Sequence, residues 1–184
     1  KRNKTHKKDD GLVAVSGGKD SHMIVKRLIE NHGVKNPLLV TVTDEFTHTK
    51  AGLYNINNLV TRYDLDHITF RCQPKTFIEE TRKDFFAELH PLKWIEKKIY
   101  SVPIEIAKSY GIKLVFFGEN SSYEYGTSKT LDVFHPASDD THIIFMGAIY
   151  PYSIRDSLKQ ACVIGFKHLD DFNEWPRKGS IEQY

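Results

Sequence analysis

Cysteine is scarce in this chain of 184 residues, and long apolar runs are lacking. Cys72 and Cys162 form neither a CxxC pair nor a Cys/His cluster at zinc-finger spacing, so neither a disulfide framework nor a zinc knuckle is indicated. A reducing, cytoplasmic location is therefore expected. Every apolar run is too short to cross a membrane as a helix, and the start KRNKTHKKDD lacks the apolar segment of a secretory signal, so we expect a soluble protein without membrane insertion.

An excess of either charge is also lacking. Lys and Arg total 26 against 24 for Asp and Glu, which gives a net charge of +2. Binding of duplexes or tRNA through phosphate neutralisation usually needs a broad basic surface, so nucleic acid is not expected as a partner. The nine histidines form no HExxH or comparable ligand pattern, and we interpret them as surface or core residues.

The length and the 40% hydrophobic content are sufficient for one compact domain. We expect residues 1–10 to be a polar linker and residues 11–184 to form that domain. Short β-branched or aromatic runs alternate with longer stretches of helical period, which predicts βαβ units and a parallel sheet with helices on both faces. The five expected strands are residues 12–15, 38–42, 67–72, 114–117 and 143–146.

Four stretches have the period of amphipathic helices, namely residues 21–31, 50–63, 76–89 and 94–110. The second and third are expected to cover the core, and the apolar residues of the third are Phe77, Ile78, Phe85, Phe86 and Leu89. We expect the fourth to break near Ser101, because Pro103 removes one backbone donor. Residues 119–140 form the longest irregular stretch, and a loop of that length is usually functional or disordered.

The stretch SGGKDS, residues 16–21, follows the first expected strand and leads into the first expected helix. Such a turn exposes several backbone N–H groups, with the positive end of the helix dipole behind them. Gly17 and Gly18 allow positive φ and let an oxygen approach without a Cβ in the way. Ser16 and Ser21 add hydroxyl donors. The SGGKDS loop is therefore predicted to bind an anion.

Lys19 and Asp20 indicate which anion the SGGKDS loop binds. Lys19 supplies full positive charge, whereas the carboxylate of Asp20 repels a phosphate unless a divalent cation lies between them, and magnesium meets that need. The spacing is not that of the ordinary P-loop, in which four residues separate the first glycine from Gly-Lys. A tight turn with Ser16 as a simple helix cap is the alternative, but it explains neither Lys19 nor Asp20.

SGGKDS resembles the PP-loop signature of the N-type ATP pyrophosphatases, which cleave ATP between the α and β phosphates. Members adenylate a carbonyl oxygen, and a nitrogen or sulfur nucleophile then displaces AMP. The resemblance implies a three-layer α/β sandwich with a five-stranded parallel sheet, the adenine nucleotide alpha hydrolase-like fold. It also implies that residues 16–21 bind pyrophosphate and that Asp20 binds magnesium. Thr43 and Asp44, at the end of the second strand, would lie beside the adenosine of ATP, unless Asp44 instead caps the following turn.

The stretch GENSSYEYG, residues 118–126, follows the fourth expected strand and should emerge at the same edge of the sheet as SGGKDS. Together with AGLYNINNLV and the final GFKHLDDFNEWPRKGSIEQY, it resembles the bacterial N-acetyl sugar amidotransferases of surface-polysaccharide biosynthesis, including lipopolysaccharide and O-antigen. These ligases convert an acetamido group on a sugar into an acetamidino group. The resemblance implies a nucleotide-linked acetamido sugar as substrate, ATP and Mg²⁺ as cofactors, and a glutaminase subunit that supplies ammonia.

The residues of GENSSYEYG suit a hydroxyl-rich ligand. Glu119 is the candidate base that removes a proton from attacking ammonia, and Asn120 is grouped with it as catalytic. A solvated loop carboxylate is the alternative for Glu119. The expected substrate-binding residues are Ser121, Ser122, Tyr123 and Glu124. Members of the family usually carry a cysteine-rich, zinc-binding segment upstream and continue beyond residue 184, so we expect a chain truncated at both ends.

Two other functions stay open. A tRNA-modifying PP-loop enzyme, either a thiolase or a lysidine-type ligase, would need a basic face and, for thiolation, catalytic cysteines. The near-neutral charge and the isolated cysteines count against it. A non-catalytic nucleotide-binding subunit of a glutaminase complex is the second alternative, and Lys19 and Asp20 count against it.

Overall fold

A computed structural model describes residues 9–44, 49–118, 134–138, 141–150 and 153–174. The strands are β1 (Gly11–Ala14), β2 (Pro37–Thr43), β3 (His67–Arg71), β4 (Leu114–Phe117), β5 (Phe134–Ser138) and β6 (Thr141–Phe145). The helices are α1 (Lys19–Glu30), α2 (Lys50–Tyr63), α3 (Pro74–Glu88), α4 (Lys93–Tyr110), α6 (Met146–Ile149), α7 (Ile154–Val163) and the 3-10 helix η1 (Leu169–Phe172). Among these helices, none has the length and hydropathy needed to cross a membrane.

The strands form one sheet in the order β3-β2-β1-β4-β6-β5. All pairs are parallel except β5 with β6, which is antiparallel. The chain moves outward from β1 to β2 and β3, and then crosses to the other side of β1 for β4 and β6. This reversal of strand order beside β1 is the place where open α/β sheets bind ligands, at the carboxyl ends of the strands.

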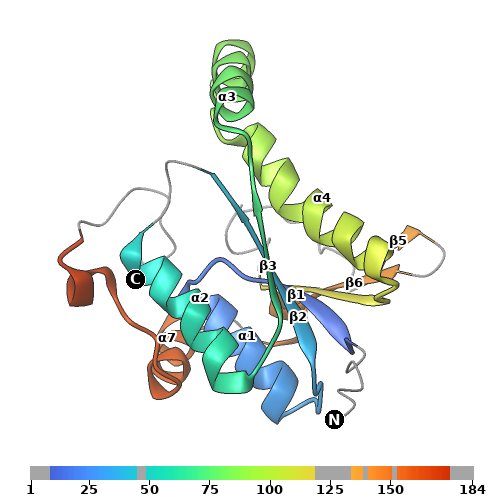
Figure 1. Ribbon diagram of the computed structural model, residues 1–184, viewed down its shortest axis with the longest axis vertical. Coiled ribbons are helices and arrows are strands. Elements are labelled where there is room, and N and C mark those ends of the chain that lie inside the picture. The colour runs from blue at the N-terminus through green and yellow to red at the C-terminus, as the bar shows by residue number, and fades with distance from the viewer. Residues whose placement is uncertain (1–8, 45–48, 119–133, 139–140, 151–152, 175–184) are drawn as a thin grey trace, which may run out of the picture.

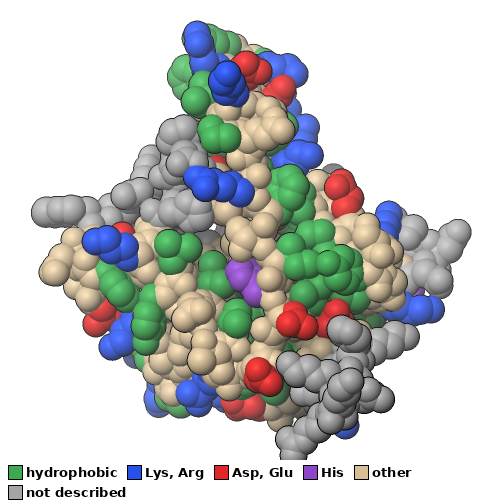
Figure 2. Space-filling model, in the orientation of Figure 1, with side chains coloured by type: hydrophobic (Ala, Val, Ile, Leu, Met, Phe, Trp, Pro, Cys, Tyr) green, Lys and Arg blue, Asp and Glu red, His purple; other side chains and the backbone are tan. Residues whose placement is uncertain are grey.

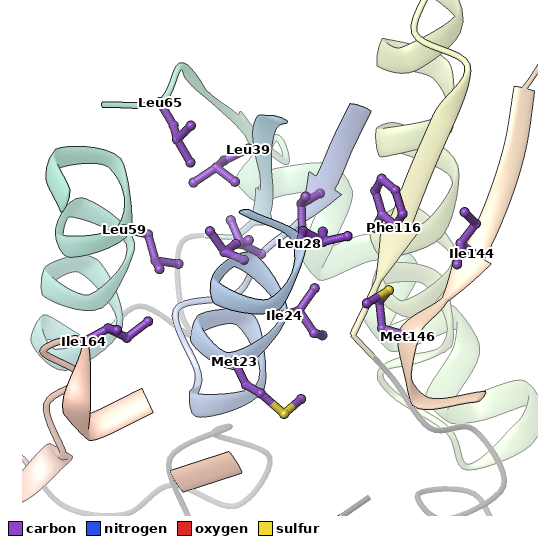
Figure 3. Packing of buried hydrophobic residues seen from close by; sticks show 13 residues of the cluster. Met23, Ile24, Leu28, Leu39, Leu59, Leu65, Phe116, Ile144, Met146 and Ile164 are labelled. Atoms are coloured by element: carbon purple, nitrogen blue, oxygen red, sulfur yellow. The ribbon is translucent and has the colours of Figure 1, made fainter. Parts of the chain in front are cut away.

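Helices cover both faces of the sheet (Figure 1). Val13 of β1 packs in a cluster with α1, α2 and the residue after α7, and Leu12 packs in a second cluster with α4. Successive strand residues point to opposite faces, so both faces of β1 are buried. Figure 3 shows the first cluster, with Ile24 of α1 between Leu59 of α2 and Phe116 of β4. The expected α/β architecture with five parallel strands is confirmed.

Strand β5 corrects the expectation that residues 119–140 are irregular throughout. Residues 134–138 form an edge strand whose register with β6 shifts between Pro136 and Ser138. Proline lacks the N–H that a strand with two neighbours would use, and it is therefore confined to edges and bulges. The sequence FHPAS reads as a loop for the same reason. Residues 119–133 and 139–140 lie outside the described part of the chain.

Helix α4 is continuous, and the expected break near Ser101 is wrong. The helix includes Pro103 and ends at Tyr110, with Gly111 in the left-handed conformation after it. Proline removes one hydrogen bond from a helix, but packing can hold the helix together across that gap. Pro103 is itself buried, as are Val102 and Ala107 of the same helix.

Helix α3 projects beyond the sheet (Figure 1) and does not cover the core, contrary to expectation. Phe77 is its only buried residue and packs beside Ile95 of α4. Phe86 and Leu89 are 77% and 78% exposed. Figure 2 shows hydrophobic side chains on this projecting end of the molecule. The apolar period predicts a helix with an apolar stripe, but it does not say whether that stripe faces the sheet.

Candidate functional site

The SGGKDS loop joins the carboxyl end of β1 to α1, as the sequence predicts. The backbone N–H of Val15 still bonds to the carbonyl of Val40 on β2, at 2.9 Å, and the chain then turns into α1 at Lys19. Gly18 is the N-cap and no side chain caps it, so the alternative in which Ser16 serves as the cap is wrong. A helix start whose N-cap residue offers no side-chain acceptor favours an anion at this point.

Gly17 takes the left-handed conformation, with φ of +83°. A Cβ at this position would lie 2.5 Å from the carbonyl oxygen of Gly52, because α2 passes directly against the loop. Both the backbone angle and the close approach therefore require glycine. Gly18 has φ of −80°, so the positive φ expected for both glycines occurs at Gly17 alone.

The two serines of the loop have different roles. The N–H of Ser16 donates to Oγ of Ser21 at 3.0 Å, and the two hydroxyl oxygens are 3.3 Å apart. Ser21 is buried and folds the loop back over the first turn of α1, whereas Ser16 is exposed. Ser16 is thus the hydroxyl that an incoming ligand can reach.

Lys19 and Asp20 form an ion pair, with Nζ 2.8 Å from Oδ2. The Lys19 side chain is only 3% exposed, and it points its charge along the loop toward this carboxylate. The other oxygen of Asp20, Oδ1, is buried and has no hydrogen-bond partner. A buried carboxylate oxygen without a partner is costly, and a cation or a donor brought by a ligand would relieve that cost.

The side chains around Asp20 suit a magnesium ion that is shared with a bound phosphate, and they do not form a metal site made entirely of protein ligands. Within the described ranges, no three His, Cys, Asp or Glu side chains are grouped to hold a metal ion. Magnesium commonly takes one or two carboxylates from the protein and completes its shell with water and substrate phosphates. Asp20 would be the protein's ligand in such an arrangement, through the unpartnered Oδ1.

A pocket of about 180 Å³ opens beside the SGGKDS loop. One end is formed by Ser16, Asp20 and Ser21, and the rest is apolar. The apolar lining residues are Ala14, Val15, Val40, Val42, Phe117, Ile99 and Pro103, with Gly118 at the end of β4. Ile99 and Pro103 belong to α4 and were not predicted as site residues; the proline inside a helical stretch was the one signal that pointed to them.

Thr43 and Asp44 lie at the same edge of the sheet and are both buried. They follow Val42 but are not among the pocket's lining residues. Alternation along β2 turns Thr43 to the face opposite Val42. Oγ1 of Thr43 donates to the carbonyl of Asp44 at 3.4 Å. The stretch that would show whether Asp44 caps a turn, residues 45–48, lies outside the described chain.

Neither cysteine belongs to the pocket lining. Burial raises the pKa of the Cys72 thiol, and the negative charge of Asp44 raises it further. That thiol therefore stays protonated near neutral pH and is a weak nucleophile. Cys162 is exposed at the end of α7, with Sγ 3.9 Å from Nε2 of His168.

Gly118 is the last described residue before the stretch predicted to be catalytic and substrate-binding, and it lines the pocket. The first residue of GENSSYEYG therefore lies at the pocket. The predicted residues Glu119, Asn120, Ser121, Ser122, Tyr123 and Glu124 lie outside the described residues.

The stretches AGLYNINNLV and GFKHLDDFNE bind each other, a contact that sequence reasoning missed. Asn55 of α2 is fully buried, donates to the carbonyl of Lys167 at 2.9 Å and accepts from its N–H at 2.8 Å. Glu174 accepts hydrogen bonds from the N–H groups of Lys50 and Ala51, at 2.8 and 3.0 Å. The segment 164–174 thus holds α2, which in turn contacts Gly17.

Several solved structures share this fold. An NMN synthetase from Francisella tularensis is 13% identical, with a TM-score of 0.63 over 95% of this chain and 68% of that one. An NH3-dependent NAD synthetase from Campylobacter jejuni subsp. jejuni NCTC 11168, in complex with the nitrate ion, is 14% identical, with a TM-score of 0.59 over 88% and 66%. A U34-tRNA thiolase from Methanococcus maripaludis, with its 4Fe–4S cluster, is 14% identical, with a TM-score of 0.58 over 90% and 61%.

No family model matches the sequence, and no curated protein matches it. Identities of 13% and 14% show a shared fold and nothing finer. The expected α/β fold with a five-stranded parallel sheet is confirmed. The chain spans between 61% and 68% of the length of these three proteins.

Proposed function

We propose that this chain is the ATP-binding domain of an ATP-dependent carbon–nitrogen ligase, with the triphosphate of ATP on the SGGKDS loop. One observation carries the proposal: the buried, unpartnered Oδ1 of Asp20 lies in a loop whose helix start has no side-chain cap, at the mouth of an apolar pocket. Each of these features alone has a structural explanation. Together they leave backbone donors, a buried cation and a carboxylate at one point, which suits a magnesium-bound polyphosphate.

The apolar pocket fits the adenine ring. Pockets for drug-sized ligands usually measure about 300–1,000 Å³, so a pocket of about 180 Å³ suits one ring system rather than a whole nucleotide. Its polar end is formed by Ser16, Asp20 and Ser21 of the SGGKDS loop. A nucleotide with its base among the apolar residues would extend its phosphates toward that end.

The chain's own groups then stabilise the departing pyrophosphate. Backbone N–H groups at the start of α1 donate to its oxygens, and Lys19 supplies a positive charge that burial strengthens. Asp20 would hold Mg²⁺, which neutralises charge on the phosphate oxygens when bound. The helix dipole of α1 points its positive end at the same place.

The finer proposal is that the acceptor is the acetamido group of a nucleotide-linked sugar. The acetamido oxygen attacks the α-phosphorus of ATP, the bond from that phosphorus to the bridging β-phosphate oxygen breaks, and pyrophosphate leaves. Ammonia adds to the adenylated carbon, loses a proton to a base and expels AMP with the former acetamido oxygen, which leaves an acetamidino group. Ammonia would come from a glutaminase subunit, and the reaction would take place in the cytoplasm.

The base and the sugar contacts are proposed from the resemblance of GENSSYEYG. Glu119 is the proposed base and Asn120 its companion, and the sugar would be bound by Ser121, Ser122, Tyr123 and Glu124. Support comes from Gly118, which places the start of this stretch at the pocket. The printed names of two structural neighbours, an NMN synthetase and an NH3-dependent NAD synthetase, are compatible with a ligase that uses ammonia.

A tRNA thiolase is the second candidate, since one structural neighbour carries that name. The described cysteines do not favour it. Cys72 is buried with a raised thiol pKa, and neither Cys72 nor Cys162 lines the pocket. Thiolation by a cysteine would need a thiolate beside the adenylated base.

The test supplies the full-length protein with ATP, Mg²⁺, ammonium and a panel of nucleotide-linked acetamido sugars, and measures AMP and pyrophosphate. Release that depends on a sugar supports the proposal, whereas release stimulated by tRNA favours the thiolase. The variant Asp20→Asn should abolish release without altering the far-UV circular dichroism. Asp84→Asn is the matched control, since Oδ2 of Asp84 on α3 is likewise buried without a partner, and it should leave release unchanged. Undiminished turnover in Asp20→Asn would refute the magnesium role.

A further inference from the structure

Pro103 and Ile99 lie one turn apart in α4, and both line the apolar pocket. In a regular helix the carbonyl of residue 99 accepts a hydrogen bond from the N–H of residue 103. Proline has no N–H, so the Ile99 carbonyl has no donor four residues ahead of it. The helix break that the sequence predicts at this point is absent, but the hydrogen bond from residue 103 to the Ile99 carbonyl is still lost.

The position of this carbonyl matters because the pocket has two chemically different ends. Its polar side chains, on Ser16, Asp20 and Ser21, all belong to the SGGKDS loop. The remaining side chains that line it are apolar, so they can enclose a ring but cannot form hydrogen bonds with the polar atoms at its edge. At the α4 wall, the backbone carbonyl of Ile99 is the acceptor that Pro103 leaves without its helical donor.

We propose that the carbonyl of Ile99, freed by Pro103, accepts a hydrogen bond from the 6-amino group of adenine and thereby selects ATP over 6-oxo purine triphosphates. The inference rests on the proposed function, since it takes the base of ATP to occupy this pocket. Adenine presents a donor at position 6, whereas hypoxanthine presents a carbonyl oxygen there. When two acceptors face each other, neither has a hydrogen-bond donor. A site built around a hydrogen bond therefore strongly rejects the 6-oxo purine.

The helix carries an unfavourable residue at this position. Proline is the least favourable residue in a helix interior, and α4 accommodates it through the packing of its buried face against the sheet and α3. A residue that restores the N–H should pair the Ile99 carbonyl inside the helix and make α4 more stable. Loss of adenine selectivity in such a variant is then distinguishable from loss of folding.

The experiment measures the dissociation constants of ATP and ITP by calorimetry, in the full-length protein without acceptor sugar, for wild type and Pro103→Val. Valine restores the N–H and is close to proline in size. The wild type should prefer ATP at least about tenfold, as expected when one hydrogen bond is replaced by a clash of acceptors. Pro103→Val should lose most of that preference and unfold at a higher temperature.

Val102→Ala is the matched control, because Val102 is buried in the same turn but does not line the pocket. It should lower the unfolding temperature and keep the ATP to ITP ratio. A Pro103→Val variant that keeps the wild-type ratio would overturn the inference, as would a wild type that binds ATP and ITP equally; sugar-dependent release of AMP would still support the proposed function in both cases. If neither triphosphate binds to the wild type, the inference and the proposed function both fail.

Discussion

Nδ1 of His22 lies 3.3 Å from the carbonyl oxygen of Gly18, the N-cap of α1. The carbonyl can only accept, so Nδ1 carries the proton and Nε2 is the acceptor on the ring. The side-chain nitrogen of Asn58 lies 3.3 Å from that Nε2 and also donates to the carbonyl of Ile164 at 2.8 Å. The SGGKDS loop is thereby connected to α2 and to segment 164–174 through a fully buried imidazole.

The stability of the protein should fall as the pH drops from about 6.5 to about 4, in buffer without nucleotide or metal. Burial lowers the pKa of His22 to about 4, against a smaller raising effect of the Gly18 carbonyl. The unfolded chain takes up a proton near its ordinary pKa of 6.5, so it binds more protons than the native protein within this window. His22 should contribute about 3 kcal/mol of this loss. Urea denaturation at several pH values measures it.

The variant His22→Asn keeps a donor for Gly18 and removes the titrating ring. Its unfolding free energy should vary less between these pH values than that of the wild type. His90→Asn, at an exposed histidine between α3 and α4, is the control and should retain the wild-type pH dependence. Identical pH profiles for His22→Asn and the wild type would contradict the role given to this imidazole.

Gly17→Ala should cost more stability than Gly33→Ala, although both glycines have positive φ. Gly33, with φ of +70°, has open space where a Cβ would be, so alanine there should cost about 1 kcal/mol from the backbone conformation alone. At Gly17 the Cβ would lie 2.5 Å from the backbone oxygen of Gly52, and relief of this clash needs movement of α2 or of the loop. We expect a loss of more than about 2 kcal/mol in urea denaturation. Equal losses at the two positions would show that α2 does not confine the loop.

Asn55→Ala should destabilise the protein by about 1–3 kcal/mol, because it removes both hydrogen bonds between the buried Asn55 side chain and the backbone of Lys167. Asn57→Ala, at an exposed position of the same helix, should stay within about 0.5 kcal/mol of the wild type. Amide hydrogen exchange gives a local reading, since the N–H of Lys167 should lose protection in Asn55→Ala only. Unchanged protection of the Lys167 N–H would contradict the proposed role of Asn55 in holding segment 164–174 against α2.

Phe77→Ala and Phe86→Ala should differ sharply, although the two residues share α3. Phe77 is buried and lies edge-on to Trp94, with ring centroids 6.4 Å apart, so its loss should cost about 3–5 kcal/mol. Phe86 is 77% exposed, and its loss should cost less than about 0.5 kcal/mol. Thermal or urea denaturation of both variants measures the contrast. A large cost at Phe86 would mean that the exposed stripe of α3 is covered in solution.

Local patterns predicted most of the elements for identifiable reasons. The strands have short runs nearly free of charge, and α2 matches its expected bounds because both ends carry local signals. Thr49 caps its start by accepting from the N–H of Gly52, and Asp64 takes the left-handed conformation after its end. The SGGKDS loop was predicted for the same reason, since its glycines, serines and charges are contiguous.

The parts that escaped prediction depend on contacts between distant residues. Nothing near His22 in the sequence indicates that its partners are Asn58 and, beyond it, Ile164. The α4 wall of the pocket joins residues about eighty positions away from the loop, and the outward stripe of α3 depends on what the helix packs against. Periodicity reports which residues share a face, and tertiary packing decides where that face points.

The capping of α2 by Glu174 has a consequence for the order of events during translation. Ribosomes deliver segment 164–174 after every strand of the sheet has been made. Until then the Glu174 carboxylate is missing, and the N–H groups of Lys50 and Ala51 at the start of α2 lack this acceptor. Helix α2 is the helix that confines Gly17. A nascent chain should therefore gain affinity for its nucleotide late in synthesis, after the sheet itself can already have formed.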